Sequence, residues 1–184
     1  MNTSNIKKYA PQARNDFIAA MRKQAAKYGI TADSILPAEQ KGDLLLIGDS
    51  VFPLSVMKPR DKLIKRIQAS SFEQTIDYIA YSWFNRLCAI RYMECKGLLD
   101  HGRRVLSSAD GSAGLPQILE ECLDITLPGL NASRIAELKL DGNKDEELYR
   151  ELLLAQCHAL NQVLPLLFEQ VSDESELLLS LIHI

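Results

Sequence analysis

The side chains best suited to chemistry in this sequence are two clusters of cations. Four of them fall within seven residues of one expected helix: Arg60, Lys62, Lys65 and Arg66. The second cluster is the adjacent pair Arg103 and Arg104. Clustered Lys and Arg side chains can neutralise neighbouring phosphates of a nucleic-acid backbone. The six residues are therefore predicted DNA-backbone contacts, and a purely structural role is the alternative.

The sequence contains no recognisable catalytic constellation. It has no Walker loop, nucleophile elbow, H-E-x-x-H motif or paired-carboxylate signature. The run Asp110–Gly114 superficially resembles a phosphate-binding loop, but it follows no strong strand and lacks a Gly-Lys-Ser/Thr ending. We interpret this run as part of a linker and His158, in an amphipathic helix, as a structural residue. We expect no catalytic residue and no bound cofactor in this chain.

Composition is typical of a folded cytoplasmic protein. Hydrophobic residues make up 47% of the 184 residues and charged residues 24%, which argues against disorder. The N-terminus is polar and no apolar run approaches the roughly 20 residues of a membrane span, so we expect no membrane partner. The cysteines show no C-x-x-C pair and no zinc spacing, which predicts reduced, mostly buried thiols and no metal site. They are Cys88, Cys95, Cys122 and Cys157.

Charge is distributed unevenly along the chain. Residues 1–104 hold 17 Lys and Arg against 10 Asp and Glu, a net charge of +7, whereas residues 105–184 hold 4 against 14, a net charge of −10. The first part is a candidate for binding a polyanion and the second is not. Attraction between the two parts of the chain explains the asymmetry equally well.

The chain is organised around a helix expected from Phe72 to Lys96. Its apolar residues recur at the i, i+3, i+4 and i+7 positions of a packed helix. This stripe consists of Phe72, Ile76, Ile79, Ala80, Trp83, Leu87 and Ile90. Tyr78, Tyr81 and Tyr92 lie on the opposite side, so we expect the helix to be buried on more than one face.

Two arginines flank the apolar stripe of this helix. Arg91 has a local partner in Glu94 at i+3. Arg86 has no partner nearby in the sequence, and it therefore needs a distant carboxylate, a group of backbone carbonyls, an exit to solvent, or a phosphate.

The remaining elements are mostly helical, which predicts a mainly α, bundle-like fold with a small β-hairpin. A first helix should have Pro11 in its first turn and end near Gly29, and another should begin at Pro59. Short apolar runs at 43–47 and 51–52, joined by Gly48-Asp49-Ser50, predict the hairpin. Helical pieces at 115–123 and 133–138 precede a long helix from Asp145 to about Pro165, and Ser172-Asp173 can start one more.

These elements suggest three regions. Residues 1–106 form a basic helical subdomain with the hairpin and the central helix, residues 107–114 form a linker, and residues 115–184 form an acidic helical segment. Because the apolar run 176–184 stops without a polar end, we expect the chain to be truncated there.

The segment 81–94, Y-S-W-F-N-R-L-C-A-I-R-Y-M-E, resembles a hallmark of BREX-type adenine-specific DNA methyltransferases, the PglX family, in the region before their catalytic domain. Its motif residues are Trp83, Phe84, Asn85, Arg86, Arg91 and Glu94. Further similar segments follow the same order along the chain to about Leu179. They are 7–14, 16–20, 100–102, 115–121 and 147–154. The ending 180–184 fits the family poorly and resembles translated adapter sequence.

The resemblance implies a role in bacteriophage exclusion. Enzymes of this family transfer a methyl group from S-adenosylmethionine to N6 of adenine in double-stranded DNA, using an Asn-Pro-Pro-Tyr-type motif for the flipped base. Neither this motif nor a cofactor loop occurs in the 184 residues. We therefore expect an N-terminal region, inactive alone, that supports its own methyltransferase domain and associates with DNA. The rival expectation is a module that docks another protein of the defence system.

Overall fold

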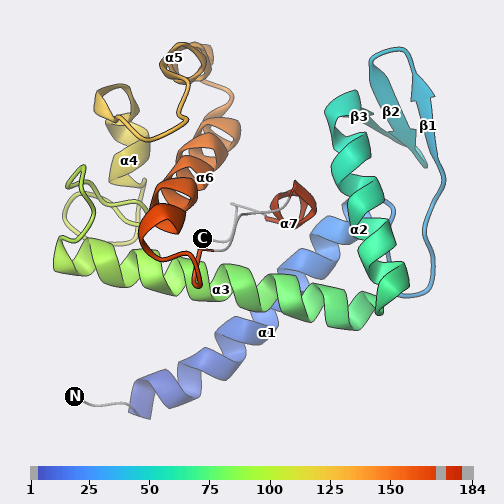
Figure 1. Ribbon diagram of the computed structural model, residues 1–184, viewed down its shortest axis with the longest axis horizontal. Helices are drawn as coiled ribbons and strands as arrows, with labels where there is room; N and C mark the ends of the chain where they lie inside the picture. The colour runs from blue at the N-terminus through green and yellow to red at the C-terminus, as the bar shows by residue number, and fades with distance from the viewer. Residues whose placement is uncertain (1–3, 169–172, 180–184) are drawn as a thin grey trace. The chain divides into compact units, whose positions relative to one another are not determined.

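The computed structural model describes residues 4–168 and 173–179, and the predicted mainly α class is confirmed (Figure 1). The chain forms two compact units. Among the described residues, unit 1 contains 4–84 and 173–179, and unit 2 contains 85–168. The central helix α3 (Phe72–Lys96) has the predicted bounds and contributes residues to both units. The predicted regions 1–106, 107–114 and 115–184 divide the chain differently and stay a prediction.

Unit 1 begins with helix α1 (Ser4–Lys27), which starts earlier than predicted. Pro11 lies inside this helix and not in its first turn. The proline ring removes one backbone donor, but Pro11 is exposed, so water can solvate the carbonyl left unbonded. The helix is followed by Gly29, whose φ of 70° lies in the left-handed region.

The predicted hairpin is present and belongs to a three-stranded antiparallel sheet in the order β1-β2-β3. The strands are β1 (Ala38–Lys41), β2 (Leu44–Ile47) and β3 (Ser50–Pro53). Lys41 pairs with Leu44, and Ile47 with Ser50, so both connections are two-residue Gly-Asp turns. Gly42 and Gly48 both have positive φ, which such a turn requires at its first position. Sequence reasoning missed β1 because all four of its residues are exposed and none but Ala38 is apolar.

Helix α2 (Met57–Ala69) follows the sheet after a 3₁₀ turn, η1 (Leu54–Val56). Pro59 is its third residue, close to the predicted start. Unit 1 has its core where α1, β2, α2 and α3 supply apolar side chains. Its fully buried members include Met21, Leu45, Leu63, Ile76, Ile79 and Trp83. The short helix α7 (Asp173–Leu177) packs on α2 within the same unit.

Unit 2 contains the remaining helices and a long irregular stretch between α3 and α4. The helices are α4 (Gln117–Glu120), the 3₁₀ turn η2 (Cys122–Asp124), α5 (Ala132–Asp141) and α6 (Asp145–Val163). The predicted start of α6 is confirmed, and it ends two residues before Pro165. Asn131 caps α5 by accepting a hydrogen bond from the backbone of Arg134, and Gly142 ends it with φ 69°. Residues 180–184, and with them the predicted unnatural ending, lie outside the described residues.

The predicted apolar stripe of α3 is confirmed. The prediction that a second face of this helix is also buried is wrong. Six of its seven predicted residues are buried, and Leu87 is half-buried. Tyr78, Tyr81 and Tyr92 are 47%, 62% and 61% exposed. A tyrosine can keep its hydroxyl in water on an exposed helix face, so aromatic type alone does not specify burial. In the part of the chain that the structure describes, no helix combines the length and apolar character of a membrane span.

Candidate nucleic-acid interface

Arg60 is not available to a phosphate, contrary to the sequence-based prediction. Its side chain is buried, with 3% of the residue exposed. Its Nε donates to the backbone carbonyl of Tyr28 at 2.8 Å, and a terminal nitrogen donates to that of Leu36. Burial lowers the pKa of Arg60, an effect that Asp61 partly opposes. Arg60 thus joins α2 to the segment that follows α1. The neighbouring cations in the sequence gave no sign that Arg60 differs from them in burial.

The outer face of α2 does carry exposed cations. Lys62 and Lys65 are exposed as predicted, and Lys58 is exposed one turn before Lys62. Their spacing of four and three residues puts them on one side of the helix. Sequence reasoning missed Lys58, although its i−4 relation to Lys62 was a usable signal. These three residues form what we name the α2 lysine stripe.

Arg66 lies at the edge of this helix face and is engaged within unit 1. It forms an ion pair with Glu174 of α7 at 3.3 Å and lies over the ring of Tyr78 at 4.3 Å from the centroid. Its side chain is 34% exposed. Arg66 can face solvent only in part, and one carboxylate already compensates its charge.

Arg103 and Arg104 belong to unit 2. Arg103 forms an ion pair with Glu121 at 2.9 Å and donates to the backbone carbonyl of His101. The pKa of Glu121 is lowered, first by a hydrogen bond from Gln117 and then by Arg103. The guanidinium of Arg104 packs against Gly111, where a Cβ would approach it within 3.3 Å. Neither arginine is as exposed as the α2 lysine stripe.

The first four family-motif residues, 83–86, are buried or half-buried on α3. Trp83 is fully buried and its indole N–H donates to the carbonyl of Ser175 at 3.0 Å. Phe84 meets Phe17 of α1 edge to face, with ring centroids 6.5 Å apart. Asn85 is half-buried. Arg86 is 4% exposed, which excludes the exit to solvent that the sequence left open.

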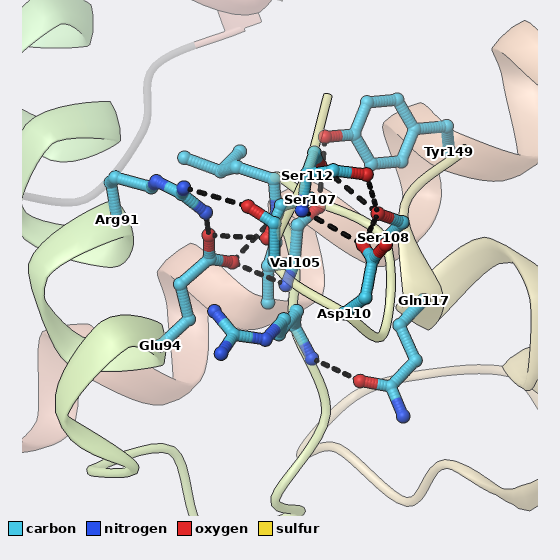
Figure 2. Close-up of polar contacts among 12 residues, drawn as sticks. Arg91, Glu94, Val105, Ser107, Ser108, Asp110, Ser112, Gln117 and Tyr149 are labelled. Carbon is cyan, nitrogen blue, oxygen red and sulfur yellow. Dashed lines mark hydrogen bonds and ion pairs between the residues drawn. The ribbon is translucent and has the colours of Figure 1, made fainter. Parts of the chain in front are cut away.

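The last motif residue, Glu94, is the hub of a polar cluster in unit 2 (Figure 2). One carboxylate oxygen accepts from the backbone N–H groups of Val105 and Leu106 at 2.7 and 2.8 Å. The other accepts from the Ser107 hydroxyl at 3.0 Å and forms the predicted ion pair with Arg91. Burial by itself raises the pKa of Glu94, but these hydrogen bonds outweigh it and the pKa is lowered. The cluster holds the start of the 107–114 connection onto α3.

The connection itself is closed by its own hydrogen bonds. Ser108 donates to Asp110 at 2.6 Å, and the backbone N–H of Ser112 donates to the same carboxylate at 2.8 Å. These contacts lower the pKa of Asp110 to about 2. Arg91 donates to the carbonyl of Gly111 at 3.2 Å. A carboxylate fills the centre of this turn, so it does not resemble a phosphate-binding loop.

The described residues show no grouping of three or more metal-ligating side chains. All four cysteines are free thiols. The expected burial is confirmed for Cys122 and Cys157 and is wrong for Cys88 and Cys95, which lie exposed on α3. Cys88 and Cys95 fall outside the apolar stripe of α3, which a count of cysteines does not show.

Two curated proteins are similar to this chain along nearly its whole length. The adenine-specific methyltransferase BrxX of Escherichia coli O9:H4 (strain HS) is 49% identical over 186 residues, which cover 97% of this chain and 15% of BrxX. The adenine-specific methyltransferase PglX of Lacticaseibacillus casei (strain Zhang) is 30% identical over 197 residues, which cover 97% of this chain and 16% of PglX. No protein-family model matches the chain. The chain thus spans less than a fifth of the length of these relatives.

Proposed function

Because this chain is homologous, over 97% of its length, to a segment of the BrxX and PglX adenine-specific methyltransferases, we propose that it is the N-terminal scaffold and DNA-associating region of such an enzyme. The whole enzyme would methylate N6 of adenine at specific DNA sites, with S-adenosylmethionine as methyl donor, in a bacteriophage-exclusion system. The homology along almost the entire chain carries this proposal.

The cofactor and the target base belong, in this proposal, to other parts of the enzyme. In the glycine- and serine-containing connection 107–114, the donors of Ser108 and Ser112 already bond the carboxylate of Asp110. The 184 residues contain no Asn-Pro-Pro-Tyr motif. These residues do not fit a methyl-donor site. The role of this region is therefore to support the methyltransferase domain and to add DNA contacts outside the reacting base.

The α2 lysine stripe is the proposed DNA contact. Lys58, Lys62 and Lys65 are exposed on one helix face, whereas Arg60 is buried and Arg66 is paired with Glu174. Lysines of this kind bind phosphates as point charges without reading sequence. Arg103 and Arg104 are secondary candidates because both are half-buried and Arg103 is paired.

The salt dependence of DNA binding tests this proposal. Each lost phosphate contact should reduce the slope of log K against log salt by about 0.9. Changing Lys58, Lys62 and Lys65 to Glu should therefore weaken duplex binding and lower the slope by roughly 2 to 3. The charge-matched control changes three exposed lysines elsewhere, Lys41, Lys96 and Lys144, to Glu. Equal slopes for wild type and the α2 variant would contradict the proposed DNA contact and would leave only the scaffold role.

An exposed apolar segment favours a second candidate function, docking of another protein of the defence system. Residues 163–167 begin at the last residue of the acidic helix α6, and four of them are exposed leucine or valine residues. Val163 is 73% exposed, Leu164 38%, Leu166 95% and Leu167 38%. Such side chains next to one another are typical of a protein contact. Changing Val163 and Leu166 to Ser should abolish capture of a partner protein while leaving DNA binding unchanged; the reverse result supports the DNA role.

A further inference from the structure

The short helix α7 belongs to unit 1, although it follows residues 85–168 of unit 2 in the sequence. Residues 173–179 belong to unit 1, whereas residues 85–168 belong to unit 2. In Figure 1, α7 is the short dark-red helix. A five-residue helix is far too short to be stable alone, so tertiary contacts must hold it in place.

Three kinds of contact hold this segment. The carboxylate of Glu174, whose side chain is 13% exposed, pairs with Arg66 of α2. The backbone carbonyl of Ser175 accepts the buried indole N–H of Trp83 at 3.0 Å. The three leucines at the end of the segment are buried, with Leu177 7% exposed and Leu178 and Leu179 fully buried. An ion pair, a backbone hydrogen bond and buried leucine side chains therefore all hold this one short segment.

Trp83 is the buried residue of unit 1 that bonds the backbone of this segment. Trp83 has no exposed surface, and an indole N–H buried in such a place needs a hydrogen-bond acceptor from the protein. The carbonyl of Ser175, 92 residues away in the sequence, accepts this N–H at 3.0 Å. Unit 1 thus presents a donor, a cation and an apolar surface to a piece of chain that is distant in sequence.

We propose that unit 1 contains a docking site for a short acidic segment ending in leucines, and that residues 173–179 of the same chain occupy it as a latch. The site recognises a carboxylate at the position of Glu174, the following backbone carbonyl, and leucine side chains three to five residues after the carboxylate. It joins residues 173–179 to unit 1 without a covalent bond. The site uses Arg66, which is not part of the α2 lysine stripe.

Amide hydrogen exchange in the full chain tests the electrostatic part of the latch. Arg66→Glu alone and Glu174→Arg alone should each speed exchange in residues 174–179 by about fivefold, as expected for loss of a partly buried ion pair. The double variant should restore slow exchange. The control pair is Arg22 and Glu73, an exposed ion pair of unit 1, whose reversal should leave the segment unchanged. Fast exchange of residues 174–179 in the wild type would overturn the proposal.

A labelled peptide tests whether the site binds the segment as a ligand. The peptide has the sequence of residues 173–179, and Leu178→Asp in the full chain should release the latch. The peptide should bind this variant but not the wild type, whose tethered segment competes at high effective concentration. A control peptide carrying Glu174→Lys should bind neither.

Three outcomes of these experiments contradict the latch in cis. One is equal binding of both peptides, and another is no peptide binding to a Leu178→Asp chain that keeps its helical circular dichroism. The third is a wild-type dimer that becomes monomeric on Leu178→Asp, which would assign the occupant to a second copy of the chain. If Leu178→Asp prevents folding, the exchange experiment with the charge-reversed pair decides alone.

Discussion

Replacing Glu94 by Gln should destabilise unit 2 through loss of charge in its buried polar cluster. The amide can still place its oxygen toward the N–H groups of Val105 and Leu106, with its NH₂ group toward Ser107 and Arg91. Two charge-assisted hydrogen bonds then become neutral ones, and the Arg91 ion pair is lost. Hydrogen bonds to charged groups contribute about 1.5–3 kcal/mol and neutral ones about 0.5–1.5 kcal/mol. The expected loss in free energy of unfolding is about 3 kcal/mol.

The pH dependence of this loss follows from the lowered pKa of Glu94. Its ordinary value is 4.5, and the folded state holds it lower through hydrogen bonds that outweigh burial. The stabilisation is therefore complete above pH 4.5 and is lost as pH falls through the folded-state pKa. The difference between wild type and the Gln variant should stay constant from pH 8 to pH 5 and decrease below that.

Urea denaturation followed by circular dichroism measures the difference, and amide exchange of Val105 and Leu106 locates it. The matched control is Glu121→Gln, because Glu121 also pairs with an arginine of unit 2 but its side chain is 40% exposed. The control should cost less than Glu94→Gln, because an exposed ion pair contributes little to stability. Two results would refute the conclusion that the charge of Glu94 stabilises this cluster. One is a Glu94→Gln variant as stable as the control, and the other is a loss in free energy of unfolding that is undiminished at pH 3.

Three further substitutions test the local structure. Tyr149→Phe should reduce the free energy of unfolding by about 1–2 kcal/mol in urea titrations, because the buried hydroxyl donates to the Val105 carbonyl at 2.9 Å; a neutral result would contradict that bond. Gly29→Ala should cost at least about 1–3 kcal/mol by thermal unfolding, since Gly29 has φ 70° and a Cβ would lie 2.6 Å from Ile47; Gly42→Ala, with similar φ but open space, is the control and should cost less. Arg60→Ala should cost about 1–3 kcal/mol in denaturant because it removes the donor of the buried Tyr28 carbonyl and of the part-buried Leu36 carbonyl. Lys58→Ala should be neutral, and equal stabilities of the two variants would show that Arg60 is not structural.

Local pattern was enough to predict the helices that depend on it. The i, i+3, i+4 repeat of α3 placed its bounds at Phe72 and Lys96, and the acidic first turn and Pro165 bracketed α6. The Arg91–Glu94 pair was also predictable because its partners are one helical turn apart. These features depend on neighbours within four residues, and a single sequence displays such neighbours directly.

The candidate site was only partly predictable, because its residues depend on partners that are distant in the sequence. Counting cations on α2 predicted that Lys62 and Lys65 face outward, and both are exposed. The count could not separate them from the buried Arg60, whose carbonyl partner Tyr28 is 32 residues away. It also could not show that Arg66 pairs with Glu174, 108 residues away. A charge cluster therefore indicates a possible surface, and its individual members are assigned only when their distant partners are known.

The amino-acid sequence by itself determined the mainly α class, the bounds of the longest central helix, the Gly-Asp turn of the hairpin and the relationship to adenine-specific methyltransferases. The tertiary structure decided which face of α3 is buried, which cations remain on the surface, and where residues 173–179 dock. The physical reason is that periodicity and turn geometry are set by adjacent residues, whereas burial and charge pairing depend on which distant segments the folded chain brings into contact.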